Sequence, residues 1–103
     1  MAEVSIGKAD LLPGEHKCLD IKGKYLSLAN IQGKFYCIDS VCMHEGGQLC
    51  EGKVGEMNAF SVTCPLHGSI YDYKTGKVLK GPSIDDVKSY KVTVKNGELF
   101  VKM

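Results

Sequence analysis

The chain is organised around two short stretches of sequence, CMH at residues 42–44 and CPLH at residues 64–67. Each stretch offers one cysteine thiolate and one histidine imidazole, and nineteen residues separate His44 from Cys64. Two cysteines and two histidines are a ligand set that a tetrahedral zinc ion accepts. The same set suits a [2Fe–2S] cluster in which two cysteines bind one iron and two histidines bind the other. The four residues alone therefore predict a metal centre and leave both kinds open.

The composition indicates one small globular domain without a strong net charge. Its 103 residues include 13 basic and 12 acidic side chains. A near-neutral chain without a basic cluster gives no electrostatic reason to bind nucleic acid. The sequence shows no signal-peptide pattern and no apolar run of the roughly 20 residues that span a bilayer. We therefore expect one domain over residues 1–103 that is cytoplasmic, monomeric and not attached to a membrane.

Short apolar runs separated by turn residues predict an all-β fold. The turn signals are KG at residues 22–23, QG at 32–33 and, most strongly, NG at 96–97. Long amphipathic helices are not expected, and the sequence allows at most a helical turn near residues 8–12 or 83–87. The expected strands are His16–Ile21, Tyr25–Ile31, Lys34–Asp39, Lys53–Val54, Asn58–Thr63, Ile70–Tyr73, Val78–Lys80, Tyr90–Lys95 and Glu98–Lys102.

Each metal-binding stretch follows an expected strand, one ending at Asp39 and the other at Thr63. The ligands are then expected in loops at strand ends, where two projections can converge on one cofactor. Glycines at positions 46, 47 and 68 follow the histidines and allow the backbone to turn tightly around sulfur. Pro65 fixes its own φ and stiffens the second loop. The cofactor-binding part is therefore expected at roughly residues 40–82.

Taken together, four runs resemble a Rieske domain, and in particular the free-standing Rieske-type ferredoxins: CMHEGGQL at 42–49, CPLHGSIYD at 64–72, TG at 75–76 and GP at 81–82. The resemblance implies an antiparallel β-sandwich or barrel with a small subdomain built from two metal-binding loops. It also implies one [2Fe–2S] cluster, with Cys42 and Cys64 on one iron and His44 and His67 on the other. Zinc is the weaker alternative, because structural zinc loops more often pair two cysteines in one half-site.

The residues around the expected cluster combine features of two kinds of Rieske protein. Respiratory Rieske proteins carry two further cysteines in a disulfide that braces the loops, and this chain has Gly47 and Leu66 at those places. Ser69 and Tyr71 match hydroxyl groups that, in the respiratory type, donate to a bridging sulfide and to a ligand sulfur. Such donors stabilise the reduced cluster and raise its potential. We therefore expect a potential above that of typical oxygenase ferredoxins, and we expect Pro82 in a loop over the cluster.

Three cysteines remain outside the ligand set. Without an export signal, metal ligation is a stronger prediction for cysteines than a disulfide framework. Cys18 and Cys37 lie in expected strands and are predicted to be small buried side chains. Cys50 lies in the loop after the first stretch and is predicted to be an exposed surface thiol, with a redox-relevant thiol as the alternative.

A fully ligated cluster leaves no open position for a substrate, and the sequence carries no nucleophile–base pair or nucleotide-binding motif elsewhere. We therefore predict an electron carrier, not an enzyme, that passes single electrons from a reductase to an oxygenase or another terminal oxidoreductase. The alternatives are a Rieske small subunit of a nitrite reductase or oxygenase and, less favoured, a zinc-stabilised interaction module. Partners are expected to dock at the cluster tip, which comprises Met43, His44, Glu45, Leu66, His67 and Gly68.

Histidine ligation predicts a reduction potential that depends on pH in the alkaline range. Each histidine would bind iron through one ring nitrogen and leave its other N–H facing solvent. Oxidised iron withdraws charge and favours loss of that proton, whereas reduction favours its retention. We expect the midpoint potential, measured by voltammetry, to fall with rising pH in the alkaline range, where these protons titrate. A potential that stays flat up to strongly alkaline pH would contradict exposed histidine ligation.

Overall fold

The computed structural model describes residues 3–41, 48–66, 68–81 and 85–102. In this part of the chain, β-strands are joined by turns, and the one helical element is a short 3₁₀ helix, η1. No helix of the described residues is long and apolar enough to cross a membrane. The elements are β1 (Glu3–Lys8), β2 (His16–Ile21), β3 (Lys24–Ile31), β4 (Lys34–Asp39), η1 (Leu49–Glu51), β5 (Lys53–Val54), β6 (Ser61–Thr63), β7 (Ile70–Asp72), β8 (Val78–Lys80), β9 (Ser89–Tyr90), β10 (Val92–Lys95) and β11 (Glu98–Lys102).

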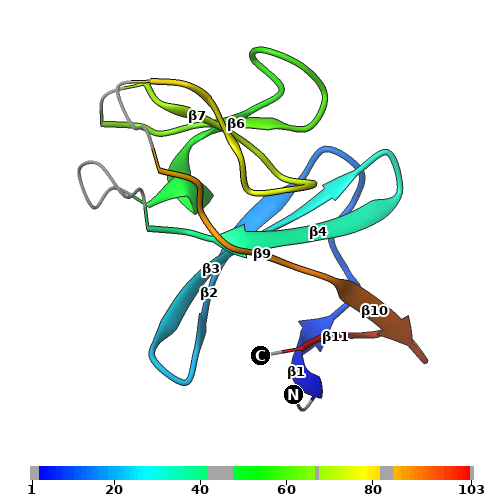
Figure 1. Cartoon of the computed structure of the whole chain (residues 1–103). Helices are drawn as coiled ribbons and strands as arrows, with labels where there is room; N and C mark the ends of the chain where they lie inside the picture. The colour runs from blue at the N-terminus through cyan, green and yellow to red at the C-terminus, as the bar shows by residue number, and fades with distance from the viewer. Residues whose placement is uncertain (1–2, 42–47, 67, 82–84, 103) are drawn as a thin grey trace.

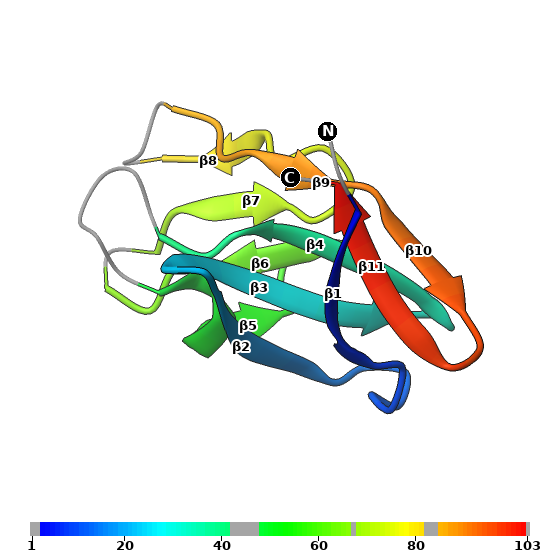
Figure 2. The same cartoon turned by 90° about the horizontal axis from the view of Figure 1, so that it is seen from below.

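The strands form three antiparallel sheets (Figures 1 and 2). The middle sheet has the strand order β2-β3-β4-β9. One of its faces packs against the sheet β1-β11-β10, and its other face packs against the sheet β5-β6-β7-β8. The predicted all-β, antiparallel fold is therefore confirmed.

Strand β3 contributes to both hydrophobic cores, because its alternate side chains are buried on opposite faces of the middle sheet. Leu26 and Leu28 belong to the core shared with β1 and β11, whereas Ala29 and Ile31 belong to the core shared with β6 and β7. Burying one leucine fully is worth about 1.5–3 kcal/mol. The first core comprises Ile6, Leu26, Leu28, Cys37, Tyr90, Leu99 and Val101, and the second comprises Ala29, Ile31, Ile38, Leu49, Val62, Cys64, Tyr71, Tyr73 and Val87.

Three two-residue turns set the register of these strands. Residues 22–23, 32–33 and 96–97 each have two successive positive φ angles, for example 51° at Asn96 and 75° at Gly97. Such angles are those of type I′ turns, whose twist matches the twist of the flanking strands. The turns form at the three predicted positions and thereby fix which residues face each other across the sheet.

Strand β1 was not expected from the sequence. It pairs with β11, and its alternation is interrupted because the register shifts just before Gly7, whose φ is 117°. The Ala9 N–H then donates to the Gly97 carbonyl at 2.8 Å. This contact continues the strand geometry, so the helical turn expected at residues 8–12 does not form. The other expected helical turn, at residues 83–87, lies partly outside the described residues.

Two expected strands are shorter or divided. Strand β6 begins at Ser61, three residues later than expected, because the Ser61 hydroxyl accepts hydrogen bonds from the N–H groups of Met57 and Asn58 in a turn. The run expected over Tyr90–Lys95 is divided into β9, which pairs with β4, and β10, which pairs with β11. The chain therefore passes from the middle sheet to an outer sheet near Lys91.

A buried hydrogen bond joins the middle sheet to the β5–β8 side of the molecule. Ser27 on β3 and Tyr73 just after β7 are both buried, and their hydroxyl oxygens lie 2.5 Å apart. Burial raises the pKa of Tyr73 to about 12, although the hydrogen bond with Ser27 acts to lower it. The phenol therefore stays neutral far into the alkaline range.

Removing the Tyr73 hydroxyl is expected to destabilise the fold. Tyr73→Phe leaves the buried Ser27 hydroxyl without this partner, which costs about 1–3 kcal/mol of unfolding free energy. The matched control is Tyr25→Phe, because Tyr25 is 50% exposed and a surface change of this kind stays within about 0.5 kcal/mol. Urea unfolding of both variants provides the measurement, and equal stability of the two would show that the buried pair contributes nothing.

Candidate metal centre

The second stretch of expected ligands, residues 64–67, begins where β6 ends. Cys64 directly follows Thr63, and its side chain is 2% exposed. The Cys64 N–H donates to the Ser69 carbonyl at 2.7 Å, and the Gly68 N–H donates back to the Cys64 carbonyl at 3.1 Å. Gly68 has a φ of 78°, a conformation that a residue without a side chain adopts at little cost. These two bonds close the base of a short loop, and His67 lies outside the described residues.

The first metal-binding stretch is closed at its base in a similar way. Val41 and Gln48 form an isolated antiparallel bridge, and the Leu49 N–H donates to the Ser40 carbonyl at 2.5 Å. Leu49 is fully buried, so it anchors the returning chain in the core. The expected ligands at positions 42 and 44 lie outside the described residues.

The bases of both loops lie at the same end of the molecule. In Figures 1 and 2 the end of β4 and the turn between β6 and β7 lie on the left in both views. The sequence predicted that each loop would follow a strand, and this holds for the chain after β4 and after β6. The fold therefore brings two loops, nineteen residues apart in sequence, to one end of the structure.

Two hydroxyl-bearing side chains lie just beyond the second loop, inside the protein. Ser69 is 1% exposed, Tyr71 is fully buried, and Tyr71 pairs with Val62 across β6 and β7. Ser69 is also the residue whose carbonyl receives the Cys64 N–H. Leu66, by contrast, is 58% exposed at the loop. Pro82, expected in a loop over the cluster, lies outside the described residues.

The prediction for Cys37 is confirmed. Cys37 is buried in the core shared with β1 and β11. Burial raises the pKa of its thiol to about 12, and the nearby Asp39 carboxylate raises it further. At neutral pH this thiol is therefore protonated and unreactive.

The predictions for Cys18 and Cys50 were wrong, because these two residues form a disulfide. Their Cα atoms lie 4.9 Å apart although 32 positions separate them in sequence. Cys18 lies in β2 as expected, but it is exposed instead of buried. Cys50 lies in η1 and is 5% exposed instead of open to solvent. No local pattern signalled the pair, since η1 reaches β2 only after the chain has formed β3 and β4.

A comparison with protein families identifies the family to which the chain belongs. The model of the family described as "Rieske [2Fe-2S] domain" matches residues 3–91. The chain belongs to this family. The resemblance seen in the two stretches is thereby confirmed, and the cofactor of the Rieske domain is a [2Fe–2S] cluster, so the zinc alternative is not supported.

The relatives of this Rieske domain match it over nearly the whole chain. The ferredoxin component of the naphthalene 1,2-dioxygenase system of Pseudomonas putida is 27% identical over 99 residues, which are 96% of this chain and 92% of the relative. The 3-phenylpropionate/cinnamic acid dioxygenase ferredoxin subunit of Escherichia coli (strain K12) is 36% identical over 95 residues, or 92% of this chain and 87% of the relative.

Solved structures show the same fold. The ferredoxin of carbazole 1,9a-dioxygenase from Nocardioides aromaticivorans IC177 superposes with a TM-score of 0.89 and 26% identity, covering 98% of this chain and 97% of that one. A related ferredoxin solved in complex with the oxygenase of carbazole 1,9a-dioxygenase superposes with a TM-score of 0.86 and 26% identity, covering 96% of this chain and 91% of that one.

The described residues fit a Rieske cluster. A Rieske cluster needs cysteine thiolate and histidine ligands, and hydrogen-bond donors near its sulfur atoms tune its potential. Cys64 is held by its backbone hydrogen bonds, with Ser69 and Tyr71 buried beside the same loop. The base of the first loop is fixed independently by Ser40, Val41 and Gln48.

Proposed function

We propose that the protein is a cytoplasmic one-electron carrier of the Rieske ferredoxin type, which passes electrons from a reductase to an oxygenase. The observation that carries this proposal is the full-length match to relatives named as ferredoxin components of dioxygenase systems. A ferredoxin component transfers electrons and does not itself transform the substrate. The cluster supplies the required chemistry, because it takes up and releases one electron with its coordination sphere closed to substrate.

We assign the four ligands to the two loops. Cys42 and Cys64 bind one iron, and His44 and His67 bind the other. The assignment is supported by the closed base of each loop, by their common position at one end of the fold, and by the burial of Cys64. Residues 40–82 then form the cluster-binding part of a single domain.

The oxygenase and the reductase dock at the tip of the cluster-binding part. Leu66 is 58% exposed in this part, so an apolar side chain is available to a partner at the tip. The related ferredoxin of carbazole 1,9a-dioxygenase has been solved in complex with its oxygenase. Docking at the histidine ligands shortens the path for the electron and requires no permanent interface.

An EPR spectrum of the dithionite-reduced protein, isolated without air, tests the function. We expect a rhombic signal whose average g lies below that of [2Fe–2S] ferredoxins with four cysteine ligands. Cys64→Ser is expected to abolish this signal, whereas Cys37→Ala, which removes a buried thiol in the other core, is expected to retain it. A protein that stays EPR-silent after reconstitution with iron and sulfide would overturn the proposal.

Ser69 and Tyr71 are proposed to donate hydrogen bonds to cluster sulfur and so to raise the potential. Ser69→Ala and Tyr71→Phe should each lower the midpoint potential on the order of 59 mV, if each bond is about 1.4 kcal/mol stronger in the reduced state. The Tyr25→Phe variant is the matched control, because it removes an exposed phenol hydroxyl. An unchanged potential in both site variants would exclude this role.

A further inference from the structure

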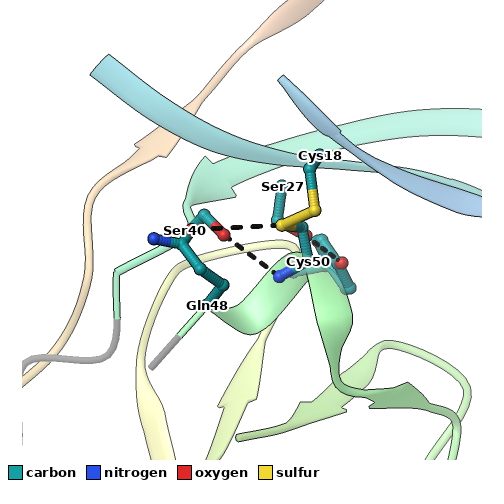
Figure 3. The surroundings of a disulfide bond; sticks show 6 residues. Cys18, Ser27, Ser40, Gln48 and Cys50 are labelled. Carbon is teal, nitrogen blue, oxygen red and sulfur yellow. Dashed lines mark hydrogen bonds between the residues drawn. A yellow bond between two sulfur atoms is a disulfide. The ribbon is translucent and has the colours of Figure 1, made fainter. Parts of the chain in front are cut away.

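The Cys18–Cys50 disulfide links an edge strand to the segment that follows the first cluster loop (Figure 3). Strand β2 stands at the end of the middle sheet in the order β2-β3-β4-β9. Cys18 on this strand is exposed, whereas Cys50 in η1 is 5% exposed. The two residues joined by the bond therefore differ in exposure, and Cys18 is the one on the solvent side.

The same segment forms the base of the first loop. Gln48 forms the bridge to Val41, and Cys50 follows two residues later. The Cys50 N–H donates to the Ser40 hydroxyl at 3.1 Å, and Ser40 is the last residue before that bridge. A covalent bond at Cys50 thus acts directly on the position of the chain that returns from the first loop.

Noncovalent contacts would keep η1 docked if the disulfide were opened. Leu49 is fully buried in the core shared with β6 and β7, and its N–H bonds to the Ser40 carbonyl. The Gln48 Oε1 atom lies 4.0 Å from the Cys50 sulfur, so a reduced Cys50 thiol has an acceptor nearby. Reduction would therefore remove only the covalent link from Cys50 to β2, while Leu49 stays in the core and the loop base is held by these hydrogen bonds alone.

We propose that Cys18–Cys50 is a reversible thiol–disulfide exchange site that controls how firmly the first cluster loop is held. A dithiol of the cell reduces it, and the reduced protein releases its cluster more readily. The effect on the cluster and the reduction of the bond in the cell rest on the proposed function and location, whereas the exchange reaction with an added dithiol does not.

The exchange requires two electrons and two protons, which the dithiol supplies. One thiolate of the dithiol attacks the Cys18 sulfur, the bond to Cys50 breaks, and Cys50 leaves as a thiolate that takes up a proton. The second sulfur of the dithiol, as a thiolate, then attacks the reductant's first sulfur, which is bonded to Cys18 in the mixed disulfide. Cys18 leaves as a thiolate and takes up a proton. The products are the cyclic disulfide of the reductant and two protein thiols.

The location proposed for the protein favours a reversible bond. Disulfides are rare in the cytosol, and those that occur there are usually transient and either catalytic or redox-sensing. Exposed disulfides are also the labile ones, because thiolates reach them easily. The buried thiol of Cys37 provides the contrast, because its pKa is raised to about 12 and it has no such access.

Thiol counting on the cluster-loaded protein tests the exchange reaction. The native protein is incubated with dithiothreitol, quenched, unfolded and alkylated, and modified cysteines are located by mass spectrometry. We expect Cys18 and Cys50 to be protected before treatment, to become alkylated after it, and to be protected again after reoxidation. Alkylation of both residues without reductant, or a bond that dithiothreitol cannot open in the native protein, would overturn the proposal.

Cluster retention tests the consequence for the loop. The double variant Cys18→Ser/Cys50→Ser, compared with wild type and with Cys37→Ala, avoids any reductant that acts on the cluster itself. With an iron chelator present, we expect the visible absorbance of the double variant to decay about tenfold faster than in the wild type, because the chain that returns through Gln48 is then no longer linked covalently to β2 and a disulfide typically contributes a few kcal/mol. Cys37→Ala is expected to decay at the wild-type rate.

Equal decay in the double variant and the wild type would overturn control of the loop by the disulfide. If the double variant fails to fold, the decay is compared between dithiothreitol-treated and untreated wild type after the reductant is removed. A wild-type protein without the expected EPR signal would overturn the proposed function instead, and thiol counting would still report on the exchange site.

Discussion

The burial of β3 on both faces is the constraint on which the arrangement of the molecule depends. A strand with water on one face can shift without moving a second layer, but β3 contributes side chains to two cores at once. A slip of one residue would exchange those two sets of side chains. The positive-φ turns at residues 22–23 and 32–33 prevent such a slip on either side of the strand. The two cores and these turns therefore fix the register of the middle sheet without a contribution from the cofactor.

The positions of the two loop bases depend on the strands of this fold. The first loop leaves β4 at Ser40 and returns through Gln48 to Leu49, which is buried against the middle sheet. The second loop leaves β6 and returns through Ser69. Each loop is tied at its base by backbone hydrogen bonds between described residues. Small changes at these bases are then expected to reach the metal, since ligand geometry governs both retention and potential.

The sequence predicted most strands because their signals were local. Apolar alternation and the turns at residues 22–23, 32–33 and 96–97 depend only on near neighbours, and the structure has these turns in place. Strand β1 was missed because its bulge at Gly7 breaks the alternation and its partner β11 lies at the far end of the chain. The two stretches were proposed as ligands from the types and spacing of their residues, and their division between the two irons came from the resemblance. Both the ligand set and this division stay predictions.

The disulfide could not be predicted from the sequence for a different reason. Cys18 and Cys50 carry no shared motif, and their approach follows from the path of β3 and β4 between them. The odd number of cysteines and the expected cytoplasmic location both argued against a bond. Cysteine pairs of this kind depend on the tertiary path of the chain, which local sequence patterns do not determine.

The pairing of β1 with β11 sets where a second protein could be joined to this one. Glu3 lies opposite Lys102, so both ends of the described chain leave the molecule side by side from the same outer sheet. That sheet packs on the face of the middle sheet opposite to the β5–β8 sheet, which carries the second loop. A tether attached at either end would leave the docking tip uncovered while raising the local concentration of an electron donor or acceptor. The topology therefore makes this domain suitable for fusion, at either terminus, to an electron donor or acceptor protein.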